Sequence, residues 1–165
     1  MKMADVMTLF DYNYWATTRV LKATMNVGPE QFVAMPQGYT TSLQATLVHI
    51  LSAERVWRIR WETGISPARL QVEDFPSPAV LRQHWQAEEQ AMRAYLATLD
   101  DAMLDHPVQF RRLSGEISDA FTRWHLLMQL VTHGTHHRSE AAALLTTYDQ
   151  SPGDLDFLFF ILDRR

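Results

Sequence analysis

The chain has 165 residues, of which 47% are apolar and 21% charged, so it is long enough for one globular domain with a core. No run approaches the roughly 18 apolar residues of a membrane span, and the segment MKMADVMTLFDYN has no signal-peptide pattern, so we expect a cytoplasmic protein without membrane contact. The net charge is −4, and the pairs Arg111-Arg112 and Arg164-Arg165 do not form a basic stripe, which argues against a nucleic-acid partner.

The chain contains no cysteine. This absence excludes disulfides, thiolate nucleophiles and cysteine-bound zinc. Any metal would therefore be held by His, Asp, Glu or carbonyl groups.

Apolar residues at three- and four-residue spacing predict a first helix over about 3–25, ended by Gly28-Pro29. A second helix is predicted over about 42–63. Thr41-Ser42-Leu43-Gln44 fits a capping box at its start, with the Thr oxygen and the Gln side chain as the capping groups. Gly64 is its expected stop.

A long connection that contains Pro67 and Pro76 follows, long enough to pass from one end of a helical bundle to the other. Ser77-Pro78 then fits a helix start, with Ser as the cap and Pro at the first helical position. We expect this third helix to end near Asp100-Asp101.

The segment 107–120 does not continue the helical pattern. Two short extended runs, 108–111 and 116–118, flank Ser114-Gly115 and predict a short β-hairpin. A fourth helix is expected over about 122–148, and a short last helix over 155–162 with Asp154 as its cap. The predicted fold class is therefore all-α, and the predicted architecture is a single domain, 1–165, forming an antiparallel four-helix bundle with a crossover connection, a short hairpin before the fourth helix and a short C-terminal helix.

Three histidines interrupt the apolar stretch LVTHGTHHRSEAAALL at 130–145. On a helix His133 and His137 stand about 40° apart around the axis and about 6 Å along it, so their imidazoles can converge on one ion. His136 competes for the same role by its three-residue spacing from His133.

A catalytic zinc usually takes three protein ligands, so a third group is needed from another helix. His49, in the apolar context ATLVHILSAERVW, is the best candidate. The remaining histidines are weaker candidates. His84 lies in a polar surface pattern, His106 lies in a loop, and His125 lies too far along the helix from His133. The alternative is that these are hydrogen-bonded core or boundary histidines without a metal.

At these residues the sequence resembles the DinB/YfiT-like superfamily of DNA-damage-inducible and thiol-transferase-related proteins. The resemblance covers nearly the whole chain. The second-helix His stands five residues before Glu54, in the family's His-x4-Glu setting, and His-x3-His-Arg follows in the fourth helix. The matching pieces are LFDYNYWAT at 9–17, LQATLVHILSAERVWRIRW at 43–61, the hairpin segment, THGTHHRSE at 132–140 and SPGDLDFLFFIL at 151–162.

The resemblance implies a four-helix bundle with one divalent metal ion, zinc or nickel, held by His49, His133 and His137. His136 then becomes the non-ligand member of the His-His pair. The family often has Gly-Gln after His-Arg, whereas this chain has Ser139-Glu140, a departure that bears on the groups around the ligands. The resemblance also implies homodimers packed through bundle helices.

Ligand histidines usually donate their other ring nitrogen to a carboxylate or carbonyl. Glu54 is a candidate partner of His49, but it lies about 140° around the helix from it. We therefore expect Glu54 to pair with Arg138 between helices, since a buried charge needs a counter-charge. Asn13 is expected to line the same cavity.

Family members with known chemistry transfer low-molecular-weight thiols, or use them to isomerise small substrates. The resemblance therefore implies a metal-dependent thiol S-transferase that acts with such a thiol on a small electrophilic substrate. The alternatives are a non-catalytic metal-binding or stress-response protein, a metal-dependent hydrolase, and a dimeric interaction module without metal.

Overall fold

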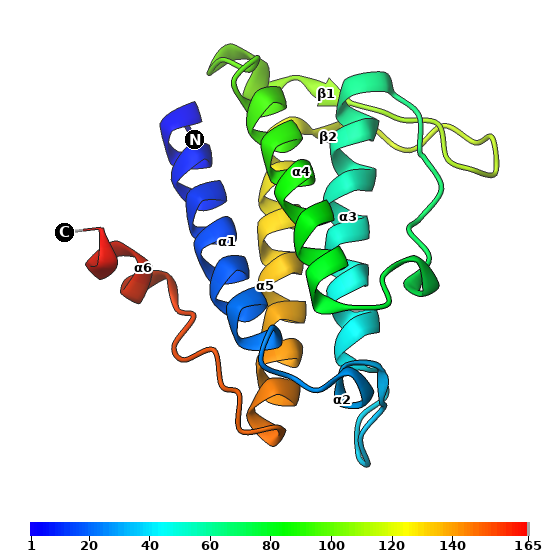
Figure 1. The fold of residues 1–165 in the computed structure, drawn as a ribbon. Coiled ribbons are helices and arrows are strands. Elements are labelled where there is room, and N and C mark those ends of the chain that lie inside the picture. Colours follow the sequence, from blue (N-terminus) through cyan, green and yellow to red (C-terminus); the bar gives the residue numbers. More distant parts are fainter. Residues whose placement is uncertain (165) are drawn as a thin grey trace.

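The computed structural model describes residues 1–164; Arg165, the last residue of the predicted domain, lies outside the described residues. Four long helices lie side by side and a short two-stranded antiparallel sheet caps one end (Figure 1). The long helices are α1 (Met3–Thr24), α3 (Leu43–Thr63), α4 (Pro78–Leu96) and α5 (Arg123–Thr147). The shorter elements are α2 (Pro29–Val33), α6 (Phe157–Asp163), the 3₁₀ turns η1 (Val72–Asp74) and η2 (Ala102–Asp105), and the strands β1 (Pro107–Val108) and β2 (Phe121–Thr122). The predicted helical class is thereby confirmed.

The start of α3 differs from the predicted capping box. Ser42, not Thr41, is the cap, and its Oγ accepts a hydrogen bond of 3.1 Å from the backbone N–H of Ala45. Gln44 turns away from the helix start, because its amide donates to the carbonyls of two residues in the α3–α4 connection. Gly64 ends the helix as predicted, with φ of 71°, a left-handed conformation that glycine adopts without strain.

Two other boundaries were predicted wrongly. Helix α4 ends at Leu96 rather than near 100, because the chain tightens there into three-residue turns such as Leu99 N–H to the Leu96 carbonyl and enters η2. Helix α6 begins at Phe157 after Asp156, so Asp154 does not cap it. The short helix α2 was not predicted; it begins at a proline and packs its buried Phe32 against α3.

The connection between α3 and α4 runs back along α3. It leaves the hairpin end of the molecule at Gly64, passes the middle of α3 where Leu70 N–H donates to Ser52 Oγ, and reaches the start of α3 at Gln44. Helices α3 and α4 therefore run in the same direction, while α1 and α5 run in the opposite one (Figure 1). We call residues 65–77 the crossover.

The hairpin has the predicted position but a different ladder. Pro107 pairs with Thr122 and Val108 with Phe121, so the paired strands lie at the base of the segment. The predicted turn around Ser114-Gly115 is present, since Gly115 N–H donates to the Arg112 carbonyl. Hydrogen bonds between Arg111 and the residues flanking Ile65 fasten the hairpin to the start of the crossover.

The apolar core is divided into two halves by a polar layer. One apolar cluster lies toward the hairpin end and includes Phe10 and Leu127, and the other lies toward α2 and includes Leu47 and Leu144. Each long helix contributes one buried charged or amide side chain at the level between them: Asn13 (α1), Glu54 (α3), Glu88 (α4) and Arg138 (α5). Across the described residues 1–164, no helix is both long and apolar enough to cross a membrane.

Candidate metal centre

Three histidines from two helices converge at one place on the surface of the bundle. Helix α3 supplies His49, and α5 supplies His133 and His137 one turn apart. One ring nitrogen from each lies within 4.8 Å of the other two. The ring centroids are 4.5 Å apart for His49–His137 and for His133–His137, and 5.0 Å apart for His49–His133.

This donor set fits a divalent cation. Nitrogen ligands bound about 2.1 Å from one tetrahedral zinc lie about 3.4 Å apart, so small side-chain rotations would suffice. Burial and the neighbouring histidine rings lower the pKa of His133 to about 4, and burial followed by His137 and Arg69 lowers the pKa of His49. Both rings are therefore neutral at pH 7, as metal ligands must be. None of the three rings is fully buried, so the group is open to solvent.

The Glu140 carboxylate contacts one of these histidines, His137. Its Oε2 lies 2.7 Å from His137 Nδ1, and its Oε1 lies 3.1 Å from His136 Nε2. Burial opposes ionisation of Glu140, but the hydrogen bond with His137 and the nearby histidines lower the pKa of its carboxyl. Because Nδ1 of His137 is engaged by the carboxylate, Nε2 is left for a metal.

Glu140 was not among the predicted partners of the ligands. The signal was present in the departure from the family pattern at Ser139-Glu140. A carboxylate three residues after His137 lies on the same helix face, so its contact with that ring follows from the helical spacing.

The residues predicted to surround the ligands form a buried network instead. Asn13 Nδ2 donates to Glu54 Oε1 at 2.9 Å, and Arg138 Nη1 donates to Asn13 Oδ1. Asn13 thus bridges Glu54 and Arg138, and the predicted direct pairing is replaced by an indirect one. Gly134 makes room for this bridge, because a Cβ there would lie 2.7 Å from Arg138 Nη1.

Glu54 is the member of this network with an unpaired oxygen. Within residues 1–164, only Asn13 hydrogen-bonds to its carboxyl group, and its Oε2 is buried without a partner. Burial raises the pKa of Glu54 to about 7, and the nearby carboxylates Glu88 and Glu89 add to this, against the lowering by Asn13 and Arg138. Glu54 therefore belongs to the polar layer and, in the described residues, does not hydrogen-bond to His49.

Among the other histidines, His136 lies beside His137, whereas His84 and His125 pack against aromatic rings. The rings of His84 and Phe75 have centroids 5.1 Å apart, and His125 packs against Trp124. Of residues 1–164, the sets of three or more side chains that could hold a metal are His49–His133–His137 and His136–His137–Glu140.

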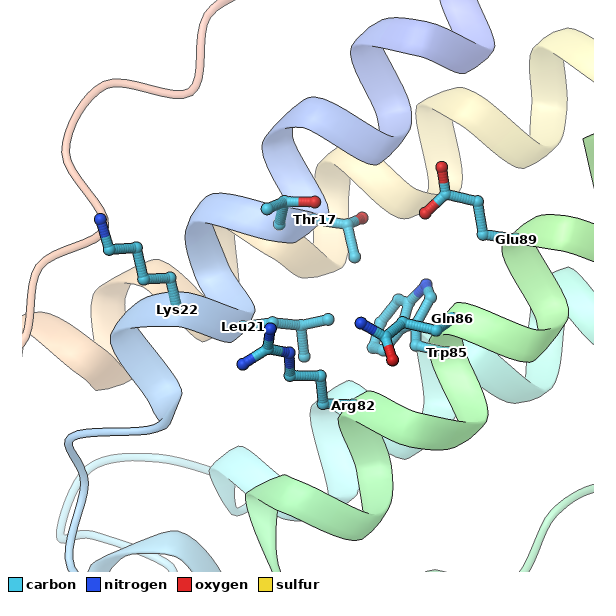
Figure 2. A pocket seen from close by; sticks show the side chains of 8 residues that line it. Thr17, Leu21, Lys22, Arg82, Trp85, Gln86 and Glu89 are labelled. Atoms are coloured by element: carbon cyan, nitrogen blue, oxygen red, sulfur yellow. The ribbon is translucent and has the colours of Figure 1, made fainter.

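A cavity of about 250 Å³ adjoins the histidine group, and His49 and His133 form part of its wall. A larger cavity of about 360 Å³ lies between α1 and α4. Figure 2 shows it, with Thr17 and Leu21 on one helix facing Arg82 and Trp85 on the other. No histidine lines this larger cavity, so the two are separate sites.

These features define a small, mostly helical protein whose histidine group could hold a metal ion. The sequence model of the DinB family matches residues 1–162, so the chain belongs to the DinB family. The predicted superfamily membership is thereby confirmed. Its fold is similar to the crystal structure of a DinB-like protein from Bacillus cereus ATCC 10987, with a TM-score of 0.67 at 17% identity, over 93% of this chain and 97% of that one. Among curated proteins no match is found.

Proposed function

We propose that this protein binds one divalent metal ion, zinc or nickel, through His49, His133 and His137. The observation that carries the proposal is the convergence of one nitrogen from each ring within 4.8 Å, from two different helices. The neutral state of His49 and His133 and the Glu140 carboxylate behind His137 support it. Imidazole ligands suit zinc and nickel alike.

The proposed activity is transfer of a low-molecular-weight thiol to a small electrophilic substrate. A cation on three neutral imidazoles supplies Lewis acidity that favours the deprotonated form of a thiol or a water. The chain has no cysteine, so the thiol must come from a small molecule. The adjoining cavity offers room for that molecule beside His49 and His133.

Other parts of the proposal rest on family membership. We infer a cytoplasmic homodimer of single-domain chains, 1–165, each a four-helix bundle with the α3–α4 crossover. Sedimentation velocity of the purified protein measures the dimer directly.

The activity is tested by isothermal titration of zinc-loaded, untagged protein with glutathione, bacillithiol and mycothiol. The proposal expects saturable binding of at least one thiol, and no binding once His133 is replaced by Ala. Zinc-loaded protein that binds none of the three would overturn the thiol-transferase assignment and leave metal binding intact.

The second candidate is a non-catalytic metal site. It is favoured by the position of the histidines, because an ion there would fasten α3 to α5. A structural site is closed, whereas a catalytic or hydrolytic site keeps an exchangeable position. Exchange of water at the bound ion, measured by relaxation on a manganese- or cobalt-substituted protein, separates the two.

A further inference from the structure

We propose that the cavity beside the histidine group recognises a carboxylate of the small molecule that binds there, through Arg60 of α3 and Arg69 of the crossover. This proposal rests on the proposed function, because it names the chemical class of ligand for the same site. Arg60, Arg69, His49 and His133 all line this one cavity.

Both charged side chains that line the cavity, Arg60 and Arg69, are positive. Neither arginine forms an ion pair in residues 1–164, and no Asp or Glu lines the cavity. Arg69 and Arg112 act on Arg60 strongly enough, after burial, to lower the pKa of its guanidinium. Two guanidiniums without carboxylate partners favour an anion, and a carboxylate matches their planar donor geometry.

Arg60 is held in place by contacts that leave its end groups free. Its guanidinium carbon lies 4.7 Å from the ring centroid of Trp57 and 4.1 Å from that of Phe110. Its Nε donates to the buried Ser66 Oγ at 3.0 Å. Within residues 1–164 its two terminal amino groups have no acceptor, so they are available to a ligand without a prior rearrangement.

Arg69 is positioned by the crossover. The next residue, Leu70, donates its N–H to Ser52 Oγ at 3.1 Å, which fixes this part of the crossover against the middle of α3. A second cavity of about 260 Å³ is also lined by His49, Ser52 and Arg69. Arg69 therefore lines both cavities, as His49 does, and can contact a ligand in either one.

The remaining wall distinguishes an organic anion from an inorganic one. Trp57, Val56 and Ala53 contribute apolar surface to the wall of the same cavity. A ligand with a short hydrocarbon segment and a terminal carboxylate can contact both the arginines and this apolar surface, whereas a bare phosphate or sulfate would leave the apolar surface without a partner. The favoured ligand class is a small carboxylate whose other end reaches the histidines.

The test compares 3-mercaptopropionate with 3-mercaptopropanamide, which differ in the charge of one end. Binding is followed through the indole N–H signal of Trp57, assigned with Trp57→Phe, in zinc-loaded and in metal-free protein. In the zinc-loaded protein, we expect 3-mercaptopropionate to bind at least tenfold more tightly than 3-mercaptopropanamide. The preference belongs to the arginines, so it should persist in the metal-free protein, where both affinities fall.

The double variant Arg60→Gln/Arg69→Gln should bind both compounds equally, with an unchanged zinc content. Arg82→Gln, in the separate cavity between α1 and α4, removes the same kind of charge and should keep the preference. Equal binding of the two compounds to the parent protein, or a preference that survives in the double variant, would overturn the proposal. Zinc content is measured in parallel, so a failure of the metal site is seen independently of the carboxylate preference.

Discussion

Glu140 and His137 show how a single side chain can prepare a ligand. The 2.7 Å contact fixes which nitrogen of His137 faces the other two rings, and the same carboxylate reaches His136. His136 thus shares Glu140 with His137, and its role as the non-ligand histidine stays a prediction. The carboxylate is only partly covered, so its effect is one of orientation and ligand basicity.

Replacing Glu140 by Gln should weaken zinc binding by about 10- to 100-fold, the usual effect of losing such a partner. The affinity is measured by competition with a chromogenic chelator at pH 7. Glu116→Gln removes a comparable charge from the exposed hairpin and serves as the control. An unchanged affinity in Glu140→Gln would show that the contact does not support the ligand.

Glu54 gives the protein a pH dependence of its own. Its pKa is about 7 in the folded protein and near the ordinary 4.5 when unfolded. Between these values the folded state holds a proton that the unfolded state has lost, so this residue lowers stability as the pH rises through that window.

In Glu54→Gln this loss is absent, and the Gln oxygen can still accept from Asn13. The free energy of unfolding of the variant, relative to the parent, should rise by on the order of 1 kcal/mol per pH unit between about pH 5 and 7, then level off. Urea unfolding with a chelator present measures it, with the exposed Glu73→Gln as control. A difference that stays constant across the window would contradict the burial of an uncompensated carboxyl.

At the scale of elements, the long helices were largely predictable and the crossover was not. Apolar spacing and stop signals located α1, α3 and α5 to within a few residues, because the helical period is a property of the local sequence. The crossover depends on long-range contacts, such as the Gln44 amide with the carbonyls of Val72 and Phe75. Gln44 was predicted to cap the helix, since that local role fits the sequence equally well.

Gln44→Ala should therefore loosen the crossover. Two carbonyls would lose a nearly buried donor, so we expect a loss of about 1–3 kcal/mol in the free energy of unfolding and faster amide exchange over 66–76. Gln37→Ala, at an exposed loop position, is the matched control. Unchanged stability together with unchanged exchange would show that this side chain does not hold the crossover in place.

At the scale of the whole molecule, the histidine group lies beside the polar layer between the two apolar halves of the core. Asn13, Glu54 and Arg138 join α1, α3 and α5 at this level. The histidines project from two of these helices, α3 and α5. The three histidines were nameable from spacing and family pattern. The bridging role of Asn13 and the space left by Gly134 were not, because they depend on how α1 and α5 meet.

The proposed metal centre requires three imidazoles from two helices to share one cation. Elemental analysis of untagged protein, incubated with zinc and then dialysed, tests it most directly. We expect roughly one zinc per chain in the parent and in His136→Gln, and far less in His49→Ala, His133→Ala and His137→Ala. A parent protein without zinc, or a His49→Ala variant that retains it with full affinity, would show that the three histidines do not share a cation.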